Sequence, residues 1–222
     1  MVPAPMRPAI LLAALLLAAA APAGHPMPGF VRVRLVTAMG PIVLALDAKH
    51  APRTTANFLT YVDDGRLDGT TFYRAARRKD AAGHVEPGLG FIQGGIDTDA
   101  RRSLDPIPIE RTDTTGIHHL TGTISMAHGP SPNSATGNFS IMLAPTPSLD
   151  AHGAYAGYAA FGHVVEGMDV ARRILAVPTG GGFDAMKGQL ILRPVPIVRA
   201  ERLDGTPRPS GRFKIWLAFK KR

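Results

Sequence analysis

Apolar and polar residues alternate along several short stretches of the chain, with the period of two that is typical of β-strands. Residues 31–36 alternate valine or leucine with arginine, and an apolar run over 41–46 follows a turn at 37–40, which predicts a β-hairpin. Further strands are predicted over 69–74, 91–95, 121–127, 137–143, 158–164 and 189–200. The last of these contains Pro194 and Pro196, which indicates an edge strand or a bulge.

Two segments have helical spacing instead. Residues 52–64 begin with a proline, carry an apolar stripe and stop at Gly65, and residues 167–177 carry a second stripe. The segments 75–89 and 96–116 contain charged and turn-forming residues and are predicted to be exposed loops. The pattern as a whole predicts a mainly β domain with one early helix and one late helix.

Composition limits the kinds of protein that this chain can be. Its 222 residues fit one domain with appendages, and its 24 glycines and 20 prolines favour a β-rich fold with many turns. The absence of cysteine excludes disulfide bonds, zinc–thiolate sites and a cysteine nucleophile. The net charge of +8 is concentrated in the tail 204–222, where Asp204 is the only acidic residue. The nearly balanced body argues against a nucleic-acid surface, and none is expected.

The first 23 residues have the pattern of a secretory signal peptide. Arg7 supplies the positive charge, residues 9–21 form an unbroken apolar run, and Ala21-Pro22-Ala23 has the small-x-small form of a cleavage site. The run is shorter than the roughly 20 residues that a transmembrane helix needs, although an uncleaved N-terminal anchor is the alternative. We therefore expect an exported bacterial protein, periplasmic or secreted, whose mature chain begins near Gly24.

The strands 69–74 and 91–95 carry the most specific polar groups in an apolar setting. Strict alternation places Phe72 and Arg74 on one face and Tyr73 on the other, and Phe91 shares a face with Gln93. If the two strands are neighbours, a guanidinium, an amide and an apolar ring meet on one surface. Such a surface could grip a peptide and place a fixed cation beside it.

Five motifs in order give this pattern a family resemblance. They are Gly69-Thr70-Thr71-Phe72-Tyr73-Arg74, Ile92-Gln93-Gly94-Gly95, Gly122-Thr123-Ile124-Ser125-Met126-Ala127, Pro132-Asn133-Ser134 with Phe139, and Phe161-Gly162-His163-Val164-Val165-Glu166-Gly167-Met168. From about Val31 to Leu203 the chain resembles the cyclophilin-type peptidyl-prolyl isomerases. The resemblance implies a closed eight-stranded antiparallel barrel capped by two α-helices. It also implies isomerisation of X-Pro bonds in proline-containing polypeptides, with no cofactor and no metal.

The resemblance also assigns roles to individual residues. Arg74 corresponds to the catalytic arginine and Gln93 to the glutamine beside it. The positions that bind substrate are Phe91, Met126 and Leu149 in the proline pocket, Ala127 and His128 along the bound peptide, and Asn138, Ser140 and Tyr158.

Several of these positions depart from the family pattern. Gly90 stands where an aromatic residue is common, Ser140 replaces the phenylalanine at the pocket floor, and Ser148 replaces a tryptophan. Asn138 replaces a glutamine and Tyr158 a histidine. Gly90 and Ser140 leave open an alternative function on the same barrel, a non-catalytic chaperone that binds proline-containing peptides.

Two further features need an interpretation. The adjacent His118 and His119 would face opposite ways on a strand, so no metal site is predicted there. The tail 204–222 ends in residues 213–222, which mix aromatic and aliphatic side chains with lysine and arginine. This end is expected either to contact anionic lipid weakly or to pack on the barrel. The predicted organisation is thus a leader over 1–23, an isomerase domain over 24–203 and a basic tail over 204–222, in a monomer.

Overall fold

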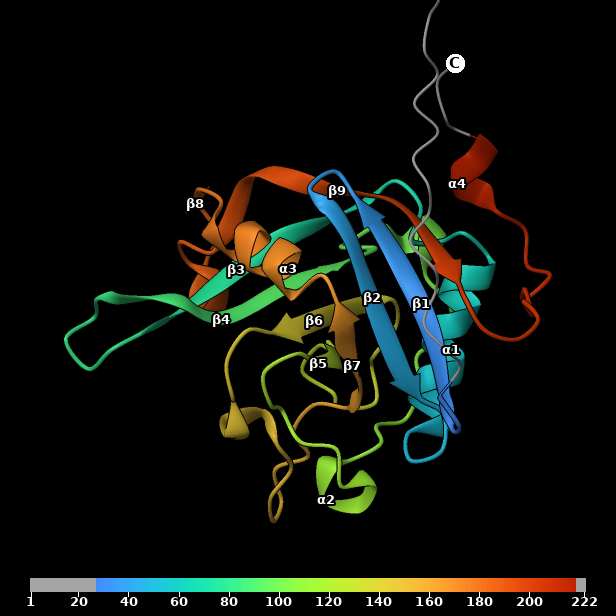
Figure 1. Ribbon diagram of the computed structural model, residues 1–222, viewed down its shortest axis with the longest axis horizontal. Coiled ribbons are helices and arrows are strands. Elements are labelled where there is room, and N and C mark those ends of the chain that lie inside the picture. The colour runs from blue at the N-terminus through green and yellow to red at the C-terminus, as the bar shows by residue number, and fades with distance from the viewer. Residues whose placement is uncertain (1–26, 219–222) are drawn as a thin grey trace, which may run out of the picture.

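The computed structural model describes residues 27–218, which form a closed β-barrel (Figure 1). The strands are β1 (Phe30–Thr37), β2 (Gly40–Asp47), β3 (Thr70–Lys79), β4 (Val85–Gly95), β5 (Thr123–Met126), β6 (Asn138–Met142), β7 (Ala160–Glu166), β8 (Thr179–Gly180) and β9 (Leu190–Arg202). They follow one another in the order β1-β2-β7-β5-β6-β4-β3-β9, and β9 pairs back with β1. All pairings are antiparallel, and the two-residue β8 only extends the edge of β9. The predicted eight-stranded barrel is therefore confirmed.

Two α-helices cover the barrel, as expected. Helix α1 (Pro52–Asp63) contacts β2 and β9, and helix α3 (Met168–Ala176) contacts β2, β3 and β4. The remaining helical segments are short: α2 (Thr112–Thr115), α4 (Ile215–Ala218), and the 3₁₀ turns η1 (Ala100–Arg102), η2 (Pro147–Leu149) and η3 (Asp184–Met186). Within residues 27–218, no helix has both the length and the apolar character needed to cross a bilayer.

The barrel interior is filled by the inward-facing side chains of its strands. Phe139 on β6 is fully buried, and its ring centroid lies 5.3 Å from that of Phe58 on α1 and 5.7 Å from that of Phe72 on β3, both edge to face. Burying rings of this size contributes roughly 1.5–3 kcal/mol each. This packing makes the strands a rigid support for the residues that point outward.

The prediction of strict alternation along β3 was wrong. The register with β4 shifts between Phe72 and Arg74, so that Tyr73 is an extra, bulged residue. Phe72 is buried in the core, whereas Arg74 and Tyr73 each line a surface cavity. A bulge re-aims side chains because two residues oppose one on the partner strand. Phe72 therefore does not share a face with Arg74.

The segment 75–89, predicted to be a loop, is instead most of a long β-hairpin. Strand β3 continues to Lys79 and β4 starts at Val85, and the Asp80 carboxylate accepts hydrogen bonds from the turn. The hairpin extends away from the barrel body (Figure 1). Gly90 lies where its strands approach most closely: its φ is +136°, and a Cβ there would be 2.0 Å from the carbonyl oxygen of Ala76. An aromatic side chain at position 90 is therefore excluded by the backbone.

The described part of the tail packs on the barrel. Trp216 on α4 is buried, with the guanidinium carbons of Arg66 and Arg102 4.6 and 5.5 Å from its ring centroid. Ser210 donates to Asp64, and Arg212 pairs with Asp105. These contacts favour the packed interpretation up to residue 218. Residues 219–222 and the predicted leader over 1–23 lie outside the described residues.

Candidate active site

Four outward-facing polar side chains form a row across adjacent strands of the barrel. Arg74 on β3 is the register partner of Gln93 on β4. Gln93 in turn pairs with Ser140 on β6, and Ser140 pairs with Ser125 on β5. Directly paired residues lie on the same face of a sheet, so the strand register alone brings together residues from three of the five sequence motifs. Ile92, the neighbour of Gln93, is fully buried, as expected if Gln93 faces outward.

The guanidinium of Arg74 is held by hydrogen bonds from all three of its nitrogens. Nε donates to Oε1 of Gln189 at 2.9 Å, and Nη1 donates to Oε1 of Gln93 at 3.0 Å. Nη2 donates to the carbonyl oxygen of Ala185 at 3.2 Å, and the guanidinium carbon lies 5.0 Å from the centroid of the Phe91 ring. An arginine side chain has five N–H donors, so two remain for a substrate. Because all three acceptors are neutral, these bonds position the cation without neutralising it.

Burial changes the titration of the groups around this row. It lowers the pKa of Arg74, although an arginine remains protonated in proteins. It raises the pKa of Tyr73, with the charge of Asp97 adding to the shift and a hydrogen bond with Gln93 opposing it. The site is thus a partly dehydrated environment, in which hydrogen bonds to a substrate are stronger than in water.

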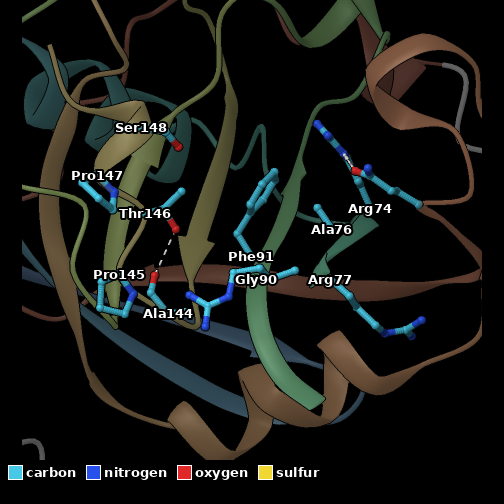
Figure 2. A pocket seen from close by; sticks show the side chains of 12 residues that line it. Arg74, Ala76, Arg77, Gly90, Phe91, Ala144, Pro145, Thr146, Pro147 and Ser148 are labelled. Carbon is cyan, nitrogen blue, oxygen red and sulfur yellow. Dashed lines mark hydrogen bonds between the residues drawn. The ribbon is translucent and has the colours of Figure 1, made fainter. Parts of the chain in front are cut away.

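One cavity, which we call the Phe91 cavity, lies on the side of Arg74. It encloses about 420 Å³ between the β3–β4 hairpin and the loop 144–148. Figure 2 shows the Phe91 ring pointing away from Gly90, while Arg77 extends to the opposite side. Arg77 donates to the carbonyl oxygen of Leu175 at the end of α3.

A second cavity, which we call the Asp97 cavity, lies on the side of Gln93. It encloses about 520 Å³ and is lined by Tyr73, Gln93, Asp97, Thr98, Ala127, His128, Gly129, Ser134, Thr136, Asn138, Phe183, Met186, Leu190, Ile191 and Pro194. Asn138 fixes its rim, because its Oδ1 accepts from the Asp97 N–H at 2.7 Å and its Nδ2 donates to the Asp97 carbonyl oxygen at 2.9 Å. The hydrogen-bonded Arg74 and Gln93 thus join the two cavities.

Behind the row, a buried chain of hydrogen bonds connects β5 to the loop that follows β6. The ring of His119 meets Asp150 Oδ1 through Nδ1 at 2.6 Å and Ser125 Oγ through Nε2 at 2.8 Å. Ser125 is 2% exposed and His119 1% exposed, so the serine is not an accessible nucleophile. His118 and His119 do not lie on a strand, and the ring Nδ1 of each approaches a different oxygen of Asp150. The expectation that they face opposite ways was therefore wrong.

The same loop carries Leu149 and Tyr158, and neither residue lines the two cavities. The N–H of Tyr158 donates to the carbonyl oxygen of Leu149 at 3.0 Å. The Tyr158 ring stacks on His128 with centroids 4.2 Å apart, and its hydroxyl is near enough to act on the pKa of Arg74. Ring nitrogens of His128 lie 2.7 and 2.9 Å from the carbonyl oxygens of Gly129 and Gly157.

Of the residues assigned from the resemblance, Met126 does not lie at the site. Its side chain is 1% exposed and belongs to the barrel core, because it alternates with the outward-facing Ser125. Ser140 faces outward but is only 8% exposed, and it lines neither cavity.

Sequence reasoning missed Gln189, Ala185 and Asp97. Gln189 is separated from Arg74 by 115 positions, and no motif links the two. Among residues 27–218, no group of three or more histidine, aspartate or glutamate side chains could hold a metal ion.

Comparison with known proteins identifies similar chains. The family model described as "Cyclophilin type peptidyl-prolyl cis-trans isomerase/CLD" matches residues 32–202. Peptidyl-prolyl cis-trans isomerase A of Dickeya dadantii is 39% identical over 147 residues, which cover 66% of this chain and 72% of that protein. A peptidyl-prolyl cis-trans isomerase of Acinetobacter baylyi is 35% identical over 173 residues, covering 78% and 84%.

Solved structures share the fold at lower identity. A cyclophilin-type peptidyl-prolyl cis-trans isomerase of Cryptosporidium parvum aligns with a TM-score of 0.58 and 21% identity, over 80% of this chain and 99% of that one. The same protein in the presence of the dipeptide Ala-Pro aligns with a TM-score of 0.59 and 20% identity, over 78% and 99%.

Proposed function

Because the chain belongs to the cyclophilin-type peptidyl-prolyl cis-trans isomerase family, we propose that Arg74 catalyses rotation about X-Pro bonds in exported polypeptides. The enzyme class, a peptidyl-prolyl cis-trans isomerase, follows from that membership. The neighbouring structure with Ala-Pro supports a proline-containing peptide as the ligand. The catalytic role of Arg74 and the exported substrates are the proposed part.

The chemistry requires a donor that prefers the twisted amide to the planar one. The barrier to rotation is roughly 18–20 kcal/mol because the C–N bond has partial double-bond character. Twisting breaks the conjugation and localises a lone pair on the prolyl nitrogen. A fixed cationic donor aimed at that nitrogen stabilises the transition state more than the ground state, which is the condition for catalysis.

The observation that carries the proposal is the state of the Arg74 guanidinium. It is positioned by three neutral acceptors, keeps two free N–H donors and lies beside the apolar ring of Phe91. A prolyl ring packed on Phe91 would place its nitrogen near those donors. Neither a nucleophile nor a cofactor takes part in such a rotation.

The test is turnover of a proline peptide by Arg74 variants. We expect Arg74→Ala to lose about 99% of kcat/KM, in the range of a lost electrostatic donor. Arg74→Lys should recover little of it, because an ammonium does not reproduce the planar donor set. The matched control is Arg101→Ala, which removes an exposed arginine paired with Asp99. Full activity of a folded Arg74→Ala would refute the mechanism.

The second candidate function is a chaperone that binds proline-containing peptides without catalysis. The observation that favours it is the lack of large side chains on two sides of the Phe91 cavity. Gly90 and the exposed Ser148 leave the cavity open beside the Phe91 ring. Peptide binding without any acceleration of isomerisation by the wild type would select the chaperone.

The cell compartment belongs to the proposal as well. The leader pattern over 1–23 supports export to the periplasm or secretion, with the polypeptides there as substrates. Mass spectrometry of the protein from its own host should find an N-terminus near Gly24, and a full-length cytoplasmic form would contradict export. A monomer and weak adhesion of the basic end to anionic lipid are the further expectations.

A further inference from the structure

One buried residue forms hydrogen bonds with both ends of the turn that lies in the wall of the Phe91 cavity. This wall consists of residues 144–148 and includes the start of η2, with Thr146 before the turn and Asp150 after it. The carbonyl oxygen of His119 accepts from the Thr146 N–H at 2.8 Å. The N–H of His119 donates to Asp150 Oδ1 at 3.0 Å. The main chain of His119 therefore holds the wall on both sides of η2.

The ring of His119 adds a bond to the same carboxylate and a bond to the barrel. Nδ1 lies 2.6 Å from Asp150 Oδ1, and Nε2 lies 2.8 Å from Oγ of Ser125 on β5. An ionised carboxylate only accepts hydrogen bonds, so Nδ1 carries the proton and Nε2 accepts from the serine hydroxyl. The ring thus fastens the cavity wall to a strand of the barrel.

Burial keeps this arrangement in a single protonation state at neutral pH. The side chain of His119 is 0% exposed. Burial lowers the pKa of His119, and the hydrogen bond with Asp150 offsets only part of that shift. The pKa of Asp150 stays below its usual value despite burial, because His119 donates to it. The neutral ring therefore has one donor and one acceptor, and both are used, which fixes its orientation.

Few other hydrogen bonds position the wall. Within residues 27–218, every hydrogen bond that joins residues 144–150 to a segment outside the loop 143–158 comes from His118 or His119. The ring of His118 lies 3.2 Å from Asp150 Oδ2, but it is 56% exposed, and exposed pairs of this kind contribute little. The position of residues 144–150 relative to the barrel is therefore set chiefly by His119.

We propose that His119 is a positioning residue that fixes the wall of the Phe91 cavity and thereby sets the affinity for proline-containing peptides. This inference rests on the proposed function, in which the prolyl ring packs on Phe91 inside the same cavity. Catalysis itself should be affected little, because the three acceptors that hold the Arg74 guanidinium lie outside the loop. Loss of the bond from the His119 ring to Asp150 should therefore raise KM and leave kcat nearly unchanged.

Two substitutions separate the two bonds of the ring. His119→Asn keeps an N–H donor near the position of Nδ1 and loses the bond with Ser125. His119→Gln reaches the position of Nε2 and loses the bond with Asp150. With the full chain and a short peptide that contains Ala-Pro, we expect KM and Kd to rise about tenfold in His119→Gln and to stay within about twofold of wild type in His119→Asn. In both variants kcat should stay within about twofold of wild type.

A matched control and a second variant complete the test. His50→Gln breaks another histidine–aspartate pair, at 2.8 Å from Asp47, and His50 lines neither cavity, so KM and Kd should not change. Asp150→Ala removes the acceptor instead of the ring, and Asp150 is 17% exposed, so this variant should fold even if the His119 variants do not. It should raise KM and Kd about as much as His119→Gln.

A purely structural role for His119 would lower the melting temperature of its variants without changing KM or Kd of the folded protein. Unchanged KM and Kd in folded His119→Gln or Asp150→Ala would therefore overturn the inference. Equal rises in His119→Asn and His119→Gln would also overturn it, because they would assign the effect to lost packing. If the wild type binds the peptide without turning it over, the proposed catalytic function fails instead, and the Kd values alone decide the role of His119.

Discussion

The two cavities that meet at the hydrogen-bonded Arg74 and Gln93 differ in how their charges are bonded. In the Phe91 cavity, Arg74 and Arg77 donate to neutral oxygens and Arg78 pairs with Glu86. In the Asp97 cavity, the single carboxylate has no bonded partner within residues 27–218. The first arrangement fixes the direction of a guanidinium, whereas the second leaves an exposed carboxylate to water. The comparison teaches that a charge lining a cavity has a defined direction only where neighbouring groups form hydrogen bonds with it.

The largest expected effect concerns the wall of the Phe91 cavity. Gly90→Ala should lower the free energy of unfolding by about 3 kcal/mol, because a Cβ would meet the Ala76 carbonyl at 2.0 Å and φ is +136°. Denaturant unfolding measures the change. The matched control is Gly88→Ala on the same hairpin, which also has positive φ (+75°) but open space around it, and it should cost about 1 kcal/mol. Equal losses of stability in the two variants would show that the Ala76 carbonyl does not exclude a side chain at position 90.

A smaller effect is expected from loss of a hydrogen bond that holds Arg74, the proposed catalytic residue. Gln189→Ala removes the acceptor of the Arg74 Nε and should lower kcat/KM about tenfold, or roughly 1.4 kcal/mol, through misplacement of the donors. Since Gln189 acts through Arg74, the loss should disappear in the Arg74→Ala background. Asp169→Asn, which removes an exposed carboxylate on α3 that pairs with Arg173, is the control. Additive losses in the double variant would mean that Gln189 acts on the substrate directly.

The smallest expected effect is a difference in pKa between two carboxylates: Asp150, which is hydrogen-bonded, and Asp97, which is not in the described part of the chain. Burial would raise the pKa of Asp150, but hydrogen bonds from His119 hold it below the usual value, whereas burial raises the pKa of Asp97. Carboxyl carbon shifts in an NMR titration should therefore place Asp97 above Asp150.

The same two groups contribute to stability with opposite signs. The stabilisation from Asp150 is present above its unfolded pKa and is lost as the pH falls through its lowered folded pKa. The contribution of Asp97 is present below its unfolded pKa and is lost as the pH rises through its raised folded pKa. Asp150→Asn and Asp97→Asn should therefore change the pH profile of unfolding in opposite directions. A change in the same direction for both would show that Asp97 has a bonded partner.

The fold and the centre of the site could be predicted from local patterns. Alternation marked most strands, proline and glycine marked the ends of the first helix, and the motifs around Arg74 and Gln93 placed the polar pair in the barrel. These features depend on residues close together in the chain, whose side-chain period follows from backbone geometry.

Other features depend on contacts between distant segments, and only the tertiary structure decided them. The bulge at Tyr73 and the close approach at Gly90 follow from the register of β3 with β4. The bond from Arg74 to Gln189 and the unpartnered state of Asp97 follow from how separate loops meet over the barrel. A single extra residue in one strand exchanges the faces of its neighbours, and nothing in the local pattern of apolar and polar residues records that shift.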